Sequence, residues 1–293
     1  MAALMRRQRF LESFGLDPEV LGVPDGTRIL GAIVGGSVDA SMMSGFGQVF
    51  PAVAHGAPLK ILAGGALLPM LALFSGKTDV KTLRDLEGRA VGTGSVGALV
   101  YQLTVLLLRK HGVDVSKVRF VSIGSSADIF RSVAAGIVDA GAGEASLIGE
   151  AAAHGVHLVD HGNMTLELKE YTFQAAWTSD RAIASNRDAL VRALAAYATL
   201  YRFVQTPAAR GAFLESCRSE FPHAPPGEHE AQWSYIQQYK AFAVDLTLSP
   251  QRLHYMQAVN VSFGVQSEIL PFERLADMSL AADALRLLAQ RRA

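Results

Sequence analysis

The sequence has one cysteine, no excess of charge of either sign and no apolar run long enough to cross a bilayer. The single cysteine, Cys217, excludes an internal disulfide framework and a zinc site built from several cysteines. Lys+Arg and Asp+Glu both number 27, so no basic surface for nucleic acid and no polybasic signal for anionic lipid is expected. The longest strongly apolar run, residues 66–74, is too short to span a membrane and contains Pro69.

A secretory signal is also missing from the printed sequence. The first ten residues, MAALMRRQRF, contain no apolar core and no cleavage site follows them. If the sequence is complete, it therefore predicts a cytoplasmic protein.

Half of the 293 residues are apolar, which is enough for about two domain cores at this length. An internal repeat indicates where these domains lie. GGSVDA at residues 35–40 matches AGIVDA at residues 135–140, which places Asp39 and Asp139 100 positions apart. Two copies of one unit predict two lobes of the same fold class.

The repeat extends on both sides of this motif. FLESFGLD at residues 10–17 matches LLRKHGVD at residues 107–114. The remaining aligned pairs are Ile29 with Ile129, Leu30 with Phe130, Ile33 with Val133 and, with a shift of one, His55-Gly56 with His154-Gly155.

Helices and strands alternate in each copy. The expected helices end at glycines, which commonly follow the last helical turn. The expected strands are 19–23 and 38–42 in the first copy, and 118–123 and 138–142 in the second. Such alternation predicts an α/β fold in which each lobe has a mostly parallel sheet flanked by helices.

The two copies differ at their beginnings. The second opens with a strand, residues 89–92, and a glycine turn before its first helix. The counterpart in the first copy would fall before Met1, so the opening strand of lobe one is expected to be missing. Two explanations stay open: the natural start lies upstream of Met1, or this lobe never had the strand.

The pattern changes after the second copy. Residues 171–178, YTFQAAWT, alternate and are rich in aromatic residues, which is typical of a strand. Helices are expected over 185–205, 229–243, 249–259 and 281–293. With crossings near residues 75–77 and before Tyr171, lobe one is expected over 1–76 and 171–293, and lobe two over 77–170.

Residues 92–97, GTGSVG, place a G-x-G-x-x-G motif between a strand and a helix, the context of a dinucleotide-binding turn. The next strand, however, is followed by Gly-Ser-Ser and not by an acidic residue that would hold a ribose. The preferred interpretation is a helix N-terminus whose backbone N–H groups approach an acceptor on a ligand. A tight turn without a ligand is the structural alternative.

Two small-residue loops follow matching strands of the repeat. Residues 41–48, SMMSGFGQ, present Phe46, and residues 141–146, GAGEAS, present Glu144. Phe46 either stacks on a ligand or packs in the core. Glu144 either accepts hydrogen bonds from a ligand or stabilises a helix N-terminus.

Other reactive side chains do not form a convincing centre. Asp39 and Asp139 occupy the same position of different lobes, so they are expected to anchor local backbone and not to share a site. The spacing H-x2-H-x3-H at His154, His157 and His161 is compatible with a metal, but the intervening helix end, strand and loop would separate the three. No metal, no cofactor and no catalytic residue is therefore predicted, and Cys217 is expected to be a buried structural thiol.

The combined motifs resemble a known family. GGSVDA, AHGAPLKILAGG, TLRDLEGRAVGTGSVGA and the second copy of the repeat are similar to the substrate-binding proteins of nitrate/sulfonate/taurine-type ABC importers, including thiamine-pyrimidine and riboflavin binders. The resemblance covers nearly the whole chain and is densest over residues 26–162. It implies a type II periplasmic-binding-protein fold, in which two α/β lobes close on a ligand by hinge motion.

The resemblance also implies where the ligand is held. By position, its contacts would fall on Ser44, Gly45, Phe46, Leu67, Leu68, Gly94, Ser95, Val96, Gly97, Ala98, Gly143, Glu144, Tyr171 and Phe173. None of these is an Arg or Lys. A heteroaromatic ligand with N–H donors is therefore slightly favoured over a sulfonate or carboxylate, because Glu144 would repel an anion.

The resulting prediction is the solute-binding component of an ABC importer, with a small polar organic ligand in the inter-lobe cleft and a membrane permease as partner. The resemblance implies a periplasmic location, in contrast to the missing signal. Two alternatives stay open: an enzyme on the same fold, lyase-like or cofactor-dependent, and a sensor domain that is not exported. The sequence specifies neither the oligomeric state nor the ligand.

Overall fold

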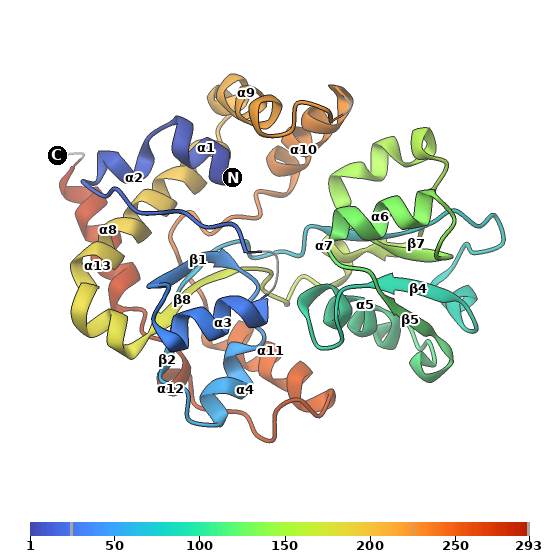
Figure 1. Ribbon diagram of the computed structural model, residues 1–293, viewed down its shortest axis with the longest axis horizontal. Coiled ribbons are helices and arrows are strands. Elements are labelled where there is room, and N and C mark those ends of the chain that lie inside the picture. The colour runs from blue at the N-terminus through green and yellow to red at the C-terminus, as the bar shows by residue number, and fades with distance from the viewer. Residues whose placement is uncertain (24–25, 225, 292–293) are drawn as a thin grey trace. The chain divides into compact units, whose positions relative to one another are not determined.

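The computed structural model describes residues 1–23, 26–224 and 226–291, and within them the chain forms two compact units. Unit 1 comprises Met1–Leu67, Glu170–Pro225 and Ile236–Ala293, and unit 2 comprises Leu68–Lys169 and Pro226–Tyr235. Each unit contains one sheet flanked by helices (Figure 1). The predicted α/β class is confirmed.

The sheet of unit 1 has three strands in the order β1-β8-β2. They are β1 (Ala40–Ser44), β2 (Leu59–Gly64) and β8 (Ala175–Ser179). The central strand, β8, runs antiparallel to both neighbours, so β1 and β2 share one direction. The mostly parallel sheet expected for each lobe is therefore not found in unit 1, because β8 returns from unit 2 between β1 and β2. Trp177 of β8 is fully buried and forms part of the core of this unit.

Helix α8 (Asp180–Val204) is the longest element of unit 1, and it packs against α13 (Ser279–Gln290). Ser179 caps its first turn by accepting the N–H of Ala182. The other helices are α1 (Ala2–Arg7), α2 (Phe10–Ser13), α3 (Gly26–Gly35), α4 (Val49–Ala54), η4 (Pro207–Ala209), α9 (Arg210–Glu220), α11 (Pro250–Ser262) and α12 (Phe272–Leu275). Helix α10 (Pro226–Tyr239) begins in unit 2 and ends in unit 1.

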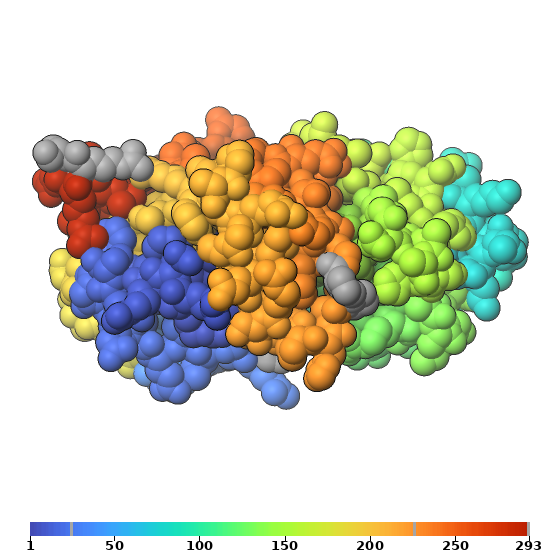
Figure 2. Space-filling model, turned by 90° about the horizontal axis from the view of Figure 1, so that it is seen from above, coloured from blue at the N-terminus to red at the C-terminus, as the bar shows by residue number. Residues whose placement is uncertain are grey.

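The N-terminal helix α1 is held to the surface of unit 1 by α9. Arg6 forms a 2.8 Å ion pair with Glu220, and Arg7 pairs with Glu215. The N-terminal segment and α9 accordingly lie side by side in Figure 2. Leu4 and Met5 are buried on the opposite side of the helix, so α1 is part of the folded unit.

The sheet of unit 2 has five strands in the order β5-β4-β6-β3-β7. They are β3 (Leu71–Ser75), β4 (Ala90–Thr93), β5 (Arg119–Ser122), β6 (Ala140–Glu144) and β7 (His157–Asn163). Strand β4 is parallel to β5 and β6, whereas β3 is antiparallel to β6 and β7. Four of the five strands therefore share one direction, as a mostly parallel sheet requires.

The helices of unit 2 follow its strands in turn. They are η1 (Leu83–Leu86), α5 (Leu99–Lys110), η2 (Val115–Lys117), α6 (Ser126–Ala134), η3 (Ala145–His154) and α7 (Met164–Glu167). Asp139 anchors the start of β4, because its Oδ2 accepts the backbone N–H of Ala90 at 2.9 Å. The predicted backbone role is confirmed for Asp139. For Asp39 it is not met, because among the described residues its carboxylate accepts a 3.3 Å hydrogen bond from the side chain of Asn186 and none from a backbone N–H.

Three expectations need correction. Residues 19–23 are not a strand, since they pair with none of the strands in the described part of the chain. The strand expected over 171–178 begins only at Ala175. Leu71–Ser75, expected within lobe one, forms β3 in the sheet of unit 2 because it pairs with β6. No helix in the described part of the chain is long and apolar enough to cross a membrane.

Candidate functional site

The parallel strands of unit 2 end together at one edge of their sheet. Strands β4, β5 and β6 are parallel neighbours, so their carboxyl ends meet there, which is where α/β proteins usually bind ligands. Beyond these ends lie the turn at residues 94–98 and the start of α6. Glu144 is the last residue of β6. The edge therefore brings together five consecutive predicted residues and Glu144.

The turn after β4 is open to solvent. Ser95, Val96 and Gly97 are all exposed, and the apolar side chain of Val96 is 79% exposed. Gly97 has a φ of +83°, a backbone conformation that favours glycine. Ala98, the N-cap of α5, supplies no side-chain hydrogen bond, so the first N–H groups of this 12-residue helix have no side-chain cap. The turn can present backbone donors to an acceptor group.

Glu144 is half-buried and accepts a 2.8 Å hydrogen bond from Ser126 Oγ, the first residue of α6. Burial raises the pKa of the Glu144 carboxyl, the Ser126 hydrogen bond lowers it, and the charge of Glu228 raises it further. The net direction is upward. Glu144 can therefore accept or donate a hydrogen bond as its protonation state changes.

Gly143 beside it has a structural reason to be glycine. A Cβ at this position would approach Phe130 Cδ2 to 2.7 Å, closer than real Cβ contacts allow. Gly94 lies close to the chain at Gly124, where a Cβ would be 3.5 Å from the carbonyl oxygen. Of these two predicted residues, Gly143 is explained by core packing alone.

In unit 1 the predicted residues at the end of β1 are tied into the fold. Ser44 Oγ accepts a 3.0 Å hydrogen bond from Trp177 Nε1 and lies 2.6 Å from Ser41 Oγ. Phe46 is fully buried, with its ring 5.5 Å from that of Phe50. Of its two proposed roles, the structure supports core packing for Phe46. Gly45, the remaining predicted residue of this loop, lies between Ser44 and Phe46 in the chain.

The other predicted residues of unit 1 form a second group. Tyr171 is 1% exposed and Phe173 8% exposed, while Leu67 is half-buried. The backbone N–H of Phe173 donates to Ala66 O at 3.0 Å, which fixes this segment against the end of β2. Burial raises the pKa of Tyr171, so its hydroxyl stays protonated. Leu68, the next predicted residue, is half-buried and belongs to unit 2.

A cation that the sequence analysis missed joins this second group. Arg252 of α11 donates from Nη1 to Leu67 O at 2.9 Å and to Glu170 O at 3.5 Å. Burial lowers the pKa of its guanidinium, although the nearby charge of Glu170 opposes this effect. Arg252 lies 185 residues from Leu67 in the chain. No local sequence pattern joins residues so far apart, and Arg252 lies on a helix and not in a loop that follows a strand.

One group of side chains in the described part of the chain could hold a metal ion: His111, His161 and Glu167. Both histidines are 3.0 Å from a carboxylate oxygen of Glu167. Lys110 Nζ lies 3.2 Å from the same carboxylate, so a cation already occupies part of its coordination capacity. The geometry suits a hydrogen-bonded charge cluster better than a metal site.

The three histidines of the H-x2-H-x3-H pattern are not brought together. The ring of His154 packs edge-on against Phe130 at 5.3 Å, and His157 Nε2 bonds Val80 O at 2.7 Å. Only His161 belongs to the charge cluster.

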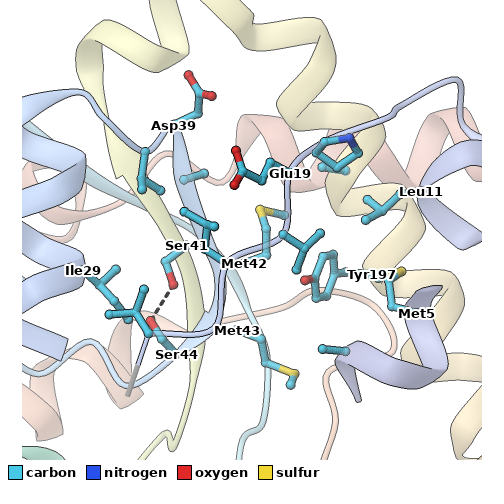
Figure 3. A pocket seen from close by; sticks show the side chains of 18 of the residues that line it. Met5, Leu11, Glu19, Ile29, Asp39, Ser41, Met42, Met43, Ser44 and Tyr197 are labelled. Carbon is cyan, nitrogen blue, oxygen red and sulfur yellow. Dashed lines mark hydrogen bonds between the residues drawn. The ribbon is translucent and has the colours of Figure 1, made fainter. Parts of the chain in front are cut away.

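A cavity of about 600 Å³ lies within unit 1 along strand β1 (Figure 3). Its walls are mostly apolar and include Met5, Leu11, Met42, Met43 and Tyr197, with the carboxylates of Glu19 and Asp39 at one end. Burial raises the pKa of Tyr197 to about 12. We call this cavity the β1 groove. Among the predicted ligand contacts, only Ser44 lines it.

Comparison with known proteins gives a family and a fold. The family model described as NMT1/THI5 like matches residues 6–208. A search of curated proteins found no significant match.

Three solved structures illustrate the fold. The alkanesulfonate-binding protein SsuA from Xanthomonas axonopodis pv. citri, bound to MOPS, is 20% identical, with a TM-score of 0.74 over 97% of this chain and 93% of that one. The periplasmic aliphatic sulphonate binding protein SsuA from Escherichia coli is 18% identical, with a TM-score of 0.71 over 94% and 88%. The desulfurization enzyme DSZB is 16% identical, with a TM-score of 0.68 over 98% and 96%. The periplasmic-binding-protein fold predicted from the sequence is confirmed.

Proposed function

Because the chain belongs to the NMT1/THI5-like family, we propose that it is a solute-binding protein that captures a small polar organic molecule for an ABC importer. In this proposal a membrane permease receives the ligand, and the protein works on the periplasmic side of the membrane. Solved binding proteins of the same fold, such as the two SsuA proteins, support a solute-binding role.

The observation that carries the proposal is the edge of the unit 2 sheet. The exposed turn at residues 95–97 leaves the first N–H groups of α5 without a side-chain cap, and Glu144 with Ser126 lies at the end of a parallel strand. We assign the turn to an acceptor group of the ligand, which the positive end of the helix dipole favours. We assign Glu144 to a donor group such as a ring N–H.

In unit 1, Arg252 changes the balance between the two ligand classes left open by the sequence. No basic residue occurs among the predicted contacts, but Arg252 is hydrogen-bonded beside Leu67 and Glu170. A sulfonate or carboxylate would be attracted by this guanidinium. Both a sulfonated or carboxylated ligand and a heteroaromatic one therefore belong in the test.

The enzyme alternative has less support. The one cysteine, Cys217, is buried in α9, and burial raises the pKa of its thiol. A reactive cysteine needs the opposite shift and an accessible position. The shared fold of DSZB, at 16% identity, does not transfer its chemistry to this chain.

The test begins with native mass spectrometry of the purified protein, followed by thermal-shift screening of sulfonates, nitrate, aromatic carboxylates, aminopyrimidines and flavins. A ligand at 100 times its dissociation constant should stabilise the protein by about 2.7 kcal/mol. A hit recovered unchanged supports the binding role. A hit recovered as a product would replace it by an enzyme.

Substitutions then locate the contact. Glu144→Gln should weaken a ligand with N–H donors by about tenfold, because a charge-assisted hydrogen bond contributes on the order of 1.5 kcal/mol. Asp160→Asn, at an exposed acid of β7, is the matched control and should leave affinity unchanged. If Glu144→Gln leaves the affinity for every hit unchanged, the assignment of this edge as the binding site is wrong.

A further inference from the structure

The chain passes between the two units through short connections. The first joins Leu67 of unit 1 to Leu68 of unit 2, and the second joins Lys169 of unit 2 to Glu170 of unit 1. A further passage lies inside α10, at residues 235–236. Units joined by a few chain segments usually move relative to each other, and the residues of those segments carry the rotation. The contacts that hold the connections therefore decide which residues rotate.

One side chain of unit 1 holds both connections. Arg252 Nη1 donates to Leu67 O at 2.9 Å and, over a longer distance of 3.5 Å, to Glu170 O. These two residues are the ends of unit 1 on the first and second connections. Ser249, the N-cap of α11, accepts the backbone N–H of Arg252 at 3.3 Å and so fixes the first turn of the helix. A charged donor on a capped helix thus ties both connections to unit 1.

One side chain of unit 2 holds the other end of the first connection. Thr165 of α7 is 1% exposed, and its Oγ1 donates to Pro69 O at 2.6 Å. The same oxygen is hydrogen-bonded to the hydroxyl of Tyr235, the last residue of unit 2 on α10. Asn163 caps α7 by accepting the Thr165 N–H at 3.1 Å. Within unit 2, Thr165 therefore joins α7, α10 and the start of the first connection.

Leu68 lies between these two clamps. Pro69 restricts it to extended backbone, because the proline ring disfavours the helical region for the preceding residue. Neither the N–H nor the carbonyl of Leu68 forms a backbone hydrogen bond within the described part of the chain. On the second connection, Leu168 is held by its N–H bond to Met164 O at 2.9 Å, while Lys169 is exposed. The dihedral angles of Leu68 and Lys169 can therefore change without breaking the bonds described above.

We propose that Arg252 and Thr165 are positioning residues that confine the rotation between the two units to Leu68 and Lys169. Arg252 restrains the connections from unit 1, and Thr165 restrains them from unit 2. The inference rests on the proposed function, in which this rotation accompanies ligand capture. The restraint itself is a property of the ligand-free protein, and it requires no contact between Arg252 and a ligand.

Loss of either clamp should lengthen the segments that rotate. Without the guanidinium of Arg252, the peptide groups of Leu67 and Glu170 are released and join them. Without the hydroxyl of Thr165, the carbonyl of Pro69 is released. The arrangement of the units should then vary more from molecule to molecule.

The test measures the distance between two spin labels, one on each unit, in the full chain without ligand. The labels are attached to cysteines introduced by Ala208→Cys in η4 of unit 1 and Ala152→Cys in η3 of unit 2, both at exposed positions. Cys217→Ala removes the native thiol. Pulsed electron double resonance then gives the distribution of label-to-label distances.

Thr165→Val removes the hydroxyl and keeps the size of the side chain, so it should broaden this distribution by several ångström. Arg252→Met should broaden it as well, with a smaller increase for Arg252→Lys, which keeps the charge. Arg252→Met should also speed amide exchange at Leu67, whose N–H donates to Ala241 O at 2.7 Å, by about tenfold. Thr165→Ser keeps the hydroxyl and should restore the parent distribution.

Arg192→Met and Thr104→Val are the matched controls. Arg192 Nη1 also donates to two carbonyls of unit 1, those of Phe14 at 3.2 Å and Gly15 at 3.1 Å. Thr104 is fully buried in α5 of unit 2 and donates to Val100 O at 2.8 Å. Neither contact involves a residue of the connections. Both controls should lower Tm and leave the width of the distance distribution unchanged.

Two outcomes would overturn the proposal. In the first, the folded Thr165→Val and Arg252 variants keep the parent distribution, which would show that other contacts restrain the units. In the second, the controls broaden the distribution as much as the clamp variants, which would show a general loosening of the fold. If Arg252→Met does not fold, Arg252→Lys and Thr165→Val decide between these outcomes. A failed ligand screen would bear on the proposed function alone, because none of these measurements uses a ligand.

Discussion

Unit 1 and unit 2 contain the same repeat but bury it to different degrees. The motif ending in Val-Asp-Ala leads into β1 in one and into β6 in the other, its last alanine being the first residue of each strand. Yet β1 is half-buried throughout and β6 is buried over four of five residues. The difference comes from the neighbours, because β6 lies between β3 and β4 and β1 is an edge strand. Burial of a strand is therefore set by its partners as much as by its own sequence.

The largest test of this comparison exchanges residues at matching positions of the two strands. Gly141 of β6 corresponds to Ser41 of β1, and a Cβ on Gly141 would come within 2.5 Å of Ile129 Cγ2. Gly141→Ser should therefore lower the free energy of unfolding by about 3 kcal/mol through overpacking. Ser41→Gly should cost less than about 1 kcal/mol. Urea denaturation of both variants measures this, and equal losses would contradict the comparison.

The second test concerns the paired aspartates. Asp139→Asn weakens the bond to Ala90 N–H and the pairing with Lys77 Nζ at 3.9 Å, so a loss of about 1–2 kcal/mol is expected. Asp39→Asn should change stability by less than about 0.5 kcal/mol, because Asp39 is exposed and no backbone N–H within the described residues donates to its carboxylate. Thermal unfolding of the two variants provides the measurement. A larger loss of stability for Asp39→Asn than for Asp139→Asn would contradict the assignment of Asp139 as the backbone anchor.

The third test uses the charge cluster of unit 2. Burial opposes ionisation of Glu167, but hydrogen bonds from His161, His111 and Lys110 outweigh it and lower the pKa to about 2 from 4.5. A depressed pKa contributes stability above about pH 4.5 that is lost as the pH falls towards 2.

Glu167→Gln should therefore lower the free energy of unfolding by about 1 kcal/mol at pH 7 and by less at pH 3. The value at pH 7 is kept small because His161 is exposed to solvent, which screens its interaction with Glu167. Denaturation of the variant and the parent at several pH values from 7 down to 3 measures this difference. Glu12→Gln, at an exposed acid in α2 of unit 1, serves as the control. The free energies of unfolding of this variant and of the parent should differ by the same amount at pH 7 and at pH 3. A constant cost of Glu167→Gln at every pH would contradict the assigned pKa.

The smallest effect is expected at the exposed turn. Val96→Ser should leave stability within about 0.5 kcal/mol of the parent, since this side chain is 79% exposed. If the turn contacts a ligand, the same substitution should alter affinity for the hits of the thermal-shift screen. A destabilisation above 1 kcal/mol would show that the turn is a packing element instead.

Much of the local structure followed from the sequence. Strands β5 and β6, the helices α8, α11 and α13 and the glycine ends of the repeat were predicted with shifts of a few residues. Such patterns depend on neighbours in the chain, so they are visible in the sequence. Residues 19–23 were wrongly predicted as a strand, because pairing depends on a partner that the pattern cannot supply.

The candidate site was less predictable for the same reason. The turn at residues 94–98 and Glu144 follow parallel strands, so their common edge could be anticipated. The aromatic ring of Phe46 could stack on a ligand, but it is fully buried and packs against Phe50 in the core. Arg252 reaches Leu67 from a helix far along the chain, a contact that only folding creates.

By itself, the sequence determined the fold class, the repeat and the family, because these are written in hydrophobic periodicity, glycine positions and local motifs. The tertiary structure alone decided which copy of each repeated residue is buried. Ile129 and Asp139 contact β4, while Ile29 and Asp39 line a groove. The physical reason is that burial and hydrogen bonding belong to pairs of elements, and identical residues acquire different roles when their neighbours differ.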